Sequence, residues 1–415
     1  MINASLLGVL EGCREFPEHI DRVYAAWHGA EGILKEELVD LADQDAEELR
    51  LLRTTTSAGA VGTCRYKLTA AQDEDFQRII EVMQAHQVGY FFYIGGNDSM
   101  DTAHKVSRLA VEQGLGLSAT GVPKTIDNDV GDPEFRLIDH TPGYGSAARY
   151  WSYIVQNVNE ENRGMSVSES VAVLQAMGRK SGWIPAASRL ADPEREMPLQ
   201  MYFAEAGHTL ENLAENVNRE LGRSGRCIVV VSEGFEAGSL GERHDGFGHI
   251  EYGASRNTVA QAVVNYLNQV GLASRGYATG QVPGVLQRST SIYASTVDIE
   301  EAYRVGRKAV QVGVEEGSGW MATILREADS PYRVRYDKVP LEAVAASARQ
   351  LPPGWIGPDG LDVTDEFIRY ARPLIGEGWP QIPIEKGLQR FARLEIRFID
   401  KKLPAYVPVR FRAPG

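Results

Sequence analysis

Short runs of apolar, β-branched and aromatic residues alternate along this chain with longer stretches in which apolar residues recur at helical spacing. The short runs lie at residues 22–27, 89–94, 114–122, 169–176, 226–231 and 321–327, and such runs are typical of buried strands in parallel sheets. Helical spacing predicts helices at residues 1–12, 32–41, 73–87, 99–110, 254–272 and 298–314, and a long helix through Trp151 and Val158 that residues 139–149 cap. The alternation predicts an α/β chain with mostly parallel sheets.

The first chemically informative stretch is Gly95-Gly96-Asn97-Asp98, which follows the apolar run at 89–94 and precedes a helical pattern. Two glycines let the backbone approach a phosphate closely, and the start of a helix favours an anion. Ligands of open α/β sheets bind at the carboxyl ends of strands. Taken alone, Gly-Gly after a strand indicates only a tight turn.

The second stretch follows the apolar run at 114–122 and carries Lys124, Thr125, Asp127 and Asp129. One carboxylate of such a pair can accept a hydroxyl proton while the other helps to hold a metal ion. A lysine and a threonine hydroxyl suit a phosphoryl group in transfer. Asp-Asn-Asp alone is also typical of a plain turn, but the two stretches together, at consecutive strand ends, favour phosphoryl transfer.

These stretches resemble the phosphofructokinase family, whose loops read GGDGS or GGDDS and then PGTIDND or PKTIDND. Three further blocks extend the resemblance: residues 57–67 resemble GGTxLGSSRxK, residues 177–184 resemble MGRxxGxIA, and residues 276–290 resemble LGHxQRGG. The resemblance weakens beyond about Ser330. It implies a phosphofructokinase-like fold of two facing α/β domains with mostly parallel sheets.

The resemblance also implies a division of the chain. Residues 1–138 and about 288–315 are expected to bind the phosphoryl donor, residues 139–287 and about 316–350 the sugar phosphate, and residues 351–415 form an extension of unknown role. In the family, an opening strand and a GG-containing loop precede the first helix, and they are not seen before Asn3. We expect them to be encoded upstream of Met1; the alternative is an incomplete donor site.

The implied activity is Mg²⁺-dependent phosphorylation of fructose 6-phosphate to the 1,6-bisphosphate, a step of glycolysis and gluconeogenesis. Asp127 would take the hydroxyl proton, with Lys124 and Thr125 on the moving group and Asp129 supporting the metal. Asn97 stands where the family usually carries a metal-facing Asp, so metal binding there could run through water. The other implied site residues are Gly95, Gly96, Asp98 and Arg65 for the donor, and Thr125, Ile126, Asp127, Met177, Gly178, Arg179, Glu233, Val285 and Arg288 for the sugar phosphate.

Two positions predict the donor. Asp98 and Lys124 are both Gly in ATP-using relatives; here the carboxylate would repel an α-phosphate and the lysine would recruit a shorter donor. We therefore expect inorganic diphosphate, in a reaction that runs readily in both directions. The alternatives are an ATP-dependent 6-phosphofructokinase, a kinase of sedoheptulose 7-phosphate, or a non-catalytic regulatory homologue, against which the intact Asp127, Asp129 and Arg179 argue.

The composition of the chain limits the kinds of molecule that it is expected to bind. A net charge of −13 without a basic cluster disfavours nucleic acid and anionic membranes, and no apolar run approaches the length of a membrane span. The three cysteines, Cys13, Cys64 and Cys227, lack paired spacing and read as buried thiols of a reducing cytoplasm. His140 is expected to be an ordinary loop residue. A homo-oligomer, dimer or tetramer, is expected from the family, although Ser170 and Thr279 stand about where neighbouring-subunit arginines occur.

Overall fold

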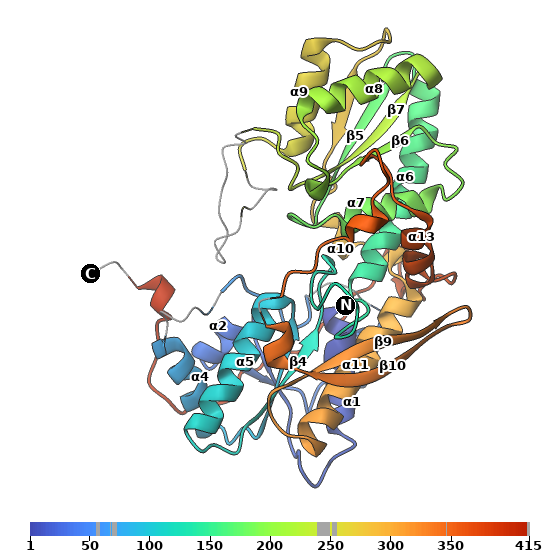
Figure 1. The fold of residues 1–415 in the computed structure, drawn as a ribbon. Helices are drawn as coiled ribbons and strands as arrows, with labels where there is room; N and C mark the ends of the chain where they lie inside the picture. The colour runs from blue at the N-terminus through green and yellow to red at the C-terminus, as the bar shows by residue number, and fades with distance from the viewer. Residues whose placement is uncertain are drawn as a thin grey trace.

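A computed structural model describes residues 1–54, 59–66, 68, 73–238, 250, 255–345 and 347–412. Within these residues the chain forms two lobes, each built around a four-stranded sheet, with the amino terminus between them (Figure 1). The predicted site motifs at 95–98, 124–129, 177–184, 233 and 285–288 follow strands of these sheets, whereas the motif at 57–67 does not. Most of the predicted site residues therefore lie in loops at the carboxyl ends of the strands.

The lower lobe of Figure 1 contains a sheet with the strand order β10-β9-β4-β3. Strands β3 (Tyr90–Gly95), β4 (Ser118–Pro123) and β9 (Trp320–Asp329) are parallel, and β10 (Tyr332–Pro340) is antiparallel to β9. Helices α1 (Ile2–Cys13) and α11 (Thr296–Glu315) cover one face, and α4 (Asp73–Ala85), α5 (Asn97–Glu112) and α12 (Leu341–Val344) cover the other. Because both faces are covered, the strands read as continuous apolar runs.

The upper lobe has a fully parallel sheet with the order β6-β7-β5-β8. Its strands are β5 (Val171–Ala176), β6 (Leu199–Tyr202), β7 (Cys227–Ser232) and β8 (Ala278–Gln281). Helices α8 (Leu210–Ser224) and α9 (Val259–Val270) pack on one face, and α6 (Tyr144–Met165) and α7 (Trp183–Ala187) on the other (Figure 1). The remaining elements are β1 (Tyr24–Ala26), α2 (Ala30–Leu34), β2 (Leu38–Asp40), α3 (Ala46–Leu51), α10 (Leu286–Ser289), α13 (Asp365–Ala371), β11 (Ile384–Glu385) and β12 (Leu388–Gln389).

The C-terminal extension contacts both lobes. Phe367 of α13 and Leu374 are buried in the same core as α6 and α7. Further along, Leu403 and Tyr406 pack against the core that α4 and α5 form in the other lobe. The segment beyond residue 350 thus packs against the cores of both lobes.

Three sequence predictions are corrected by the structure. Residues 316–350 were assigned to the sugar-phosphate domain, but β9 and β10 belong to the sheet of β3 and β4 because β9 pairs with β4. The run at 321–327 forms a strand, β9, as expected, but it is not the last strand, because β10 follows it and pairs with it in an antiparallel hairpin. The helix predicted at 32–41 ends at Leu34, and β2 follows, paired with β1, because Glu36 adopts a φ of 54° that stops the helix.

A further prediction is partly corrected at its boundary. Helix α9 begins at Val259 rather than Ala254, since the Thr258 side chain accepts the Gln261 N–H and caps it. Ala254 itself lies outside the described residues. Of the three free cysteines, Cys13 and Cys227 are buried as expected, whereas Cys64 is half-buried. In the part of the chain that the structure describes, no helix is long and apolar enough to span a membrane.

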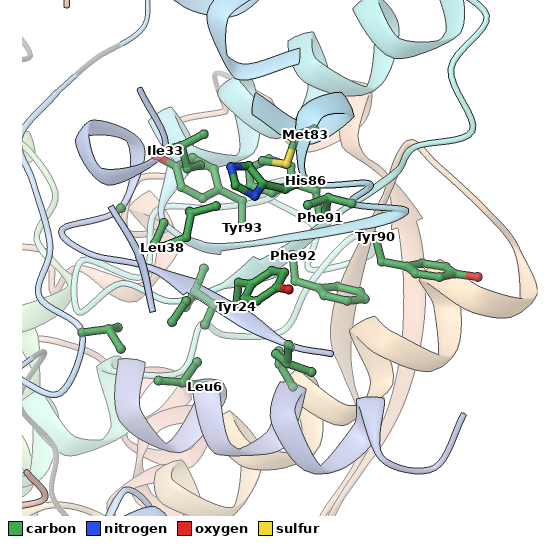
Figure 2. A pocket seen from close by; sticks show the side chains of 18 of the residues that line it. Leu6, Tyr24, Ile33, Leu38, Met83, His86, Tyr90, Phe91, Phe92 and Tyr93 are labelled. Carbon is green, nitrogen blue, oxygen red and sulfur yellow. The ribbon is translucent and has the colours of Figure 1, made fainter. Parts of the chain in front are cut away.

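A cavity of about 590 Å³ runs along the edge strand β3, between α1, β1 and α4. Figure 2 shows Leu6, Tyr24, Phe92 and Met83 among its lining side chains. At one end it reaches the first turn of α5, where Asp98 lines it.

Candidate active site

The Gly95-Gly96 loop and the Lys124–Asp129 loop lie side by side because their strands are neighbours. Strands β3 and β4 pair in parallel with Gly95 opposite Pro123, and the Lys124 N–H donates to the Gly95 carbonyl at 2.8 Å. A Cβ placed on Gly96 would lie 3.5 Å from the Thr125 Cβ. The two predicted motifs therefore meet at one sheet edge.

The residues between Thr125 and Asp129 form a tight turn. The Thr125 N–H donates to the Pro142 carbonyl at 3.1 Å, and the Thr125 hydroxyl oxygen accepts the Asp127 N–H at 3.1 Å. At the centre, Asn128 is fully buried and has a φ of 53°. This left-handed residue separates the two carboxylates that the sequence singled out.

In the other lobe, Glu233 holds the turn that follows β5. Its Oε1 atom accepts the N–H groups of Gly178 and Arg179 at 3.1 and 2.8 Å. Both residues have positive φ angles, 122° and 54°, so the turn needs this support. A Cβ on Gly234 would lie 2.0 Å from the Arg179 carbonyl oxygen, and only glycine permits that approach.

The sequence did not single out Gln287 as a site residue, yet it supports the same turn. Its Oε1 accepts the Met177 N–H at 3.1 Å and the Trp151 indole N–H at 2.8 Å. Its neighbour Arg288 is exposed on α10, and Val285, the N-cap residue of α10, is 57% exposed.

Residues from separate loops share one electrostatic field. Burial and the positive charges of Arg288 and Arg65 lower the pKa of Lys124 to about 8, against the opposing influence of Asp127 and Asp129. Burial and the charge of Asp127 raise the pKa of Asp129 to about 7. The charge of Asp127 thus disfavours the charged form of Asp129, and Lys124 interacts with both carboxylates.

The field extends to the upper lobe. Burial and the charge of Asp127 raise the pKa of Glu233 to about 7, although the N–H groups it accepts and the charge of Arg179 act in the opposite direction. Arg179 also lowers the pKa of Asp129. The structure therefore brings Arg179 and Glu233 of one lobe within electrostatic reach of Asp127 and Asp129 of the other.

The remaining predicted residues lie around this centre. Ile126 and Met177 are half-buried and pack against the aromatic core that contains Trp183. Arg65 is exposed, and its carbonyl accepts the Arg410 side chain at 2.8 Å. The loop predicted around Arg65 also includes Ser57, Ala58 and Lys67, which lie outside the described residues.

The start of helix α6 lies within the segment predicted to cap it. Its N-cap is Gly143, and Asp298 of α11 accepts the N–H groups of Gly143 and Ser146 at 2.7 and 2.9 Å. The carboxylate that accepts these N–H groups comes from a distant helix, and no local pattern indicates it.

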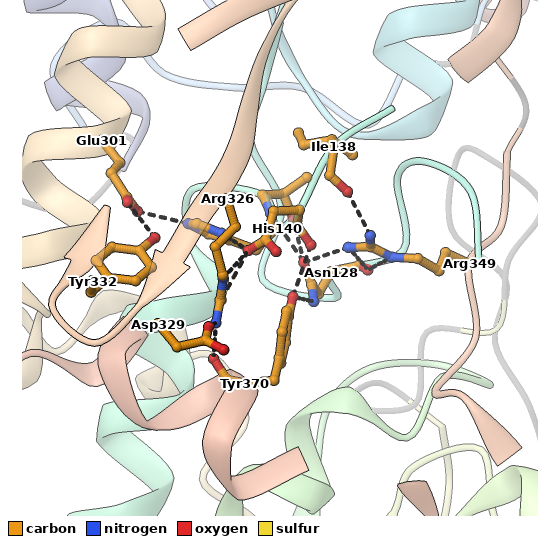
Figure 3. A network of polar contacts seen from close by, with 11 residues as sticks. Asn128, Ile138, His140, Glu301, Arg326, Asp329, Tyr332, Arg349 and Tyr370 are labelled. Atoms are coloured by element: carbon orange, nitrogen blue, oxygen red, sulfur yellow. Dashed lines mark hydrogen bonds and ion pairs between the residues drawn. The ribbon is translucent and has the colours of Figure 1, made fainter. Parts of the chain in front are cut away.

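His140 is buried rather than an ordinary loop residue. Its two ring nitrogens contact Asp139 and Glu301, each at 2.7 Å (Figure 3). Although burial disfavours the charged form, these carboxylates raise the pKa of His140 to about 9. His140 therefore lies in a buried ion-pair network with Asp139 and Glu301; among the described residues no group of three or more His, Cys, Asp and Glu side chains that could hold a metal ion is found.

Comparisons with known proteins find relatives that match nearly the whole chain. The family model described as "Phosphofructokinase" matches residues 2–313. The chain is 38% identical to the pyrophosphate–fructose 6-phosphate 1-phosphotransferase of Methylococcus capsulatus over 98% of this chain and 95% of that protein. It is 37% identical to the protein of the same name from Halomonas elongata, over 98% and 96%. The crystal structure of a pyrophosphate-dependent phosphofructokinase from Nitrosospira multiformis superposes with a TM-score of 0.87 at 36% identity, covering 98% of this chain and 96% of that one.

Proposed function

The chain belongs to the phosphofructokinase family, and from that premise we propose that it transfers a phosphoryl group from inorganic diphosphate to the 1-hydroxyl of fructose 6-phosphate. The relatives that match it over nearly their whole length carry the corresponding name. The structural observation that carries the proposal is that the Gly95-Gly96 loop and the Lys124–Asp129 turn meet at one sheet edge. The products are fructose 1,6-bisphosphate and phosphate, and the reaction is reversible.

Asp127 acts as general base in this proposal. It takes the proton of the 1-hydroxyl as the sugar oxygen bonds to phosphorus and the bond to the leaving phosphate breaks. Thr125 positions Asp127, since its hydroxyl oxygen accepts the Asp127 N–H at 3.1 Å. Lys124 supplies positive charge to the moving phosphoryl group or the leaving phosphate.

Mg²⁺ fits the donor set on one observation. Burial and then the charge of Asp127 raise the pKa of Asp129, and a hard cation bound beside Asp129 would offset both effects. Asp129 and Asn97 would hold the ion, with water and diphosphate oxygens completing its shell. The Asn97 Oδ1 atom accepts the Ser347 hydroxyl at 3.3 Å, which fixes that side chain. When bound, the ion neutralises charge that develops on the phosphoryl oxygens.

The sugar phosphate and the donor take opposite sides of this centre in the proposal. Arg179 and Arg288 would bind the 6-phosphate, since arginine makes parallel hydrogen bonds to phosphate, and the Oε2 atom of Glu233 would meet a sugar hydroxyl. The remaining assignments follow the resemblance: Ile126, Met177, Gly178 and Val285 on the sugar phosphate, and Gly95, Gly96, Asp98 and Arg65 on the donor.

The direct test supplies purified protein with fructose 6-phosphate, Mg²⁺ and either diphosphate or ATP, and measures the bisphosphate formed. We expect turnover with diphosphate and little or none with ATP. A parallel series with sedoheptulose 7-phosphate separates the sugar alternatives. Robust turnover with ATP alone would contradict the proposed donor, and no turnover with either donor would support the non-catalytic alternative.

The pKa of Lys124 predicts a pH dependence. Because this pKa is lowered to about 8, the ammonium loses its proton above that pH, and kcat/KM for diphosphate should fall there. In Lys124→Arg the guanidinium stays charged, so the alkaline limb should move to higher pH even if the activity is lower. Substrate ionisation is common to both proteins and cancels in the comparison. An alkaline limb at the same pH in both proteins would assign it to another group.

We propose a cytoplasmic compartment, which agrees with three free cysteines. We also propose a homo-oligomer, because Tyr277, Val282, Val285 and Leu286 are large apolar residues left exposed around the edge strand β8. The lobe of β3 and β4 is assigned to the donor and the lobe of β5 and β7 to the sugar phosphate.

A further inference from the structure

Asn128 is the residue on which the geometry of the catalytic turn depends. It stands between Asp127 and Asp129, is fully buried, and has a φ of 53°. Asparagine enters this left-handed conformation more readily than most other residues, and the contacts around Asn128 fix it there. Because both carboxylates are attached through Asn128, its backbone angles set the directions in which they point.

Two residues from the last 70 positions of the chain hold Asn128, as Figure 3 shows. Arg349 donates to the Asn128 main-chain oxygen from Nε and Nη2 at 3.2 and 3.1 Å, and to Oδ1 from Nη2 at 3.0 Å. The Arg349 N–H donates to the Asp129 carbonyl at 2.7 Å. The Tyr370 hydroxyl accepts the Asn128 side-chain N–H at 3.0 Å and donates to the Asp139 carbonyl at 2.9 Å.

The two holding side chains are themselves fixed by packing. Arg349 is 2% exposed, and its guanidinium lies over the rings of Phe135 and Trp183 at 4.6 and 5.3 Å. Tyr370 is 7% exposed, with its ring 4.9 Å from that of Trp355. Held on rigid neighbours, they leave Asn128 little freedom to relax.

We propose that Arg349 and Tyr370 are positioning residues for the phosphoryl transfer, which hold Asn128 in its left-handed conformation and thereby aim the carboxylates of Asp127 and Asp129. This inference rests on the proposed function and gives the region beyond residue 340 a part in it. Tyr370 acts through the Asn128 side chain, and Arg349 acts through Asn128 and the main chain of Asp129. A misplacement of reacting groups by about 1 Å can lower a rate by about 100-fold, so small losses of support should be measurable.

The first test removes one hydroxyl. Tyr370→Phe keeps the packed ring and should lower kcat by about 10-fold while KM for fructose 6-phosphate changes by less than about twofold. The matched control is Tyr332→Phe, since the Tyr332 hydroxyl donates to Glu301 at 2.7 Å in the same network (Figure 3) without contacting Asn128. We expect kcat within about twofold of wild type there. Equal losses in the two variants would overturn the proposal.

A second test asks whether Tyr370 acts through Asn128. Asn128→Gly removes the amide partner and permits the left-handed conformation. In that background, adding Tyr370→Phe should lower kcat no further, because the contact is already absent. Arg349→Lys, which keeps a charge but loses the two-pronged contact, should lower kcat in the wild-type background. Effects of Tyr370→Phe that multiply with those of Asn128→Gly would show independent roles and refute the coupling.

A third readout does not depend on turnover. Amide hydrogen exchange of a peptide covering residues 126–130 should be faster in Tyr370→Phe than in Tyr332→Phe or wild type, measured without substrate. Unchanged exchange would contradict the positioning role even if the enzyme is active. Wild-type protein that shows this exchange pattern but no turnover of fructose 6-phosphate would count against the proposed function alone.

Discussion

Replacing Asp127 by Asn should lower turnover of fructose 6-phosphate and diphosphate by about 10²- to 10⁴-fold, the range for a lost general base. The substitution keeps the shape of the side chain and the N–H that donates to the Thr125 hydroxyl oxygen, so the turn should persist. KM for fructose 6-phosphate should change little, because the sugar-phosphate contacts assigned to Arg179 and Glu233 come from the other lobe.

The control for this variant is Asp132→Asn. Asp132 is a carboxylate in the following loop, where it accepts the Leu137 N–H at 2.7 Å and the Arg136 N–H at 3.1 Å. Its loss should leave kcat within about twofold of wild type. Steady-state kinetics of both variants, with circular dichroism to check folding, decide the matter; turnover of Asp127→Asn near the wild-type rate would transfer the base role to another group.

Converting the donor preference should require two changes together, Asp98→Gly and Lys124→Gly. Asp98 lies in the first turn of α5, beside the Gly95-Gly96 loop, where an α-phosphate would meet its negative charge. A like-charge contact in a partly dry site can cost several kcal/mol. Lys124 supplies the positive charge that a short donor needs. The double variant should lose diphosphate turnover by about 100-fold and gain measurable turnover with ATP.

The single variants separate the two effects. Asp98→Gly alone should relieve the repulsion, so it should keep part of the diphosphate turnover and admit ATP weakly, whereas Lys124→Gly alone should lose diphosphate turnover without gaining ATP. Asp101→Ala is the matched control one turn further along α5, where Asp101 pairs with Lys105 at 2.5 Å. This variant should leave turnover with diphosphate and turnover with ATP unchanged. A double variant that loses diphosphate turnover and gains none with ATP would leave Asp98 without an excluding role.

The predictable part of this molecule is what its local sequence encodes. The pattern of an apolar run followed by two glycines predicted the position of the Gly95-Gly96 loop correctly. The parallel pairing of β3 with β4 then brings that loop next to the Lys124–Asp129 turn. The long helices were also predicted, because their apolar spacing extends over several turns. Such features depend on residues close together in the chain.

The unpredicted part depends on distant partners. Nothing near Asn128 indicates that Arg349 and Tyr370 will bond to it, and nothing near Gly143 indicates the cap from Asp298. Strand β6 is only four residues long, too short for periodicity to decide between strand and loop. Strand β10 is an exception, because apolar and polar residues alternate from Tyr332 to Asp337 and its partner β9 directly precedes it in a hairpin; this local period-two pattern indicates a strand, although 332–340 was not among the predicted strands.

The bonds to Asn128 also order events in time. They join it to residues 221 and 242 positions later in the chain. At ribosomal rates of about 5–20 residues per second, a stretch of 242 residues takes about 12 to 50 seconds to make. Through that interval the nascent chain carries Asp127 and Asp129 without the groups that hold their turn. Catalytic competence is therefore among the last properties that the growing polypeptide acquires. An incomplete chain released early would contain both carboxylates but lack the contacts that orient them.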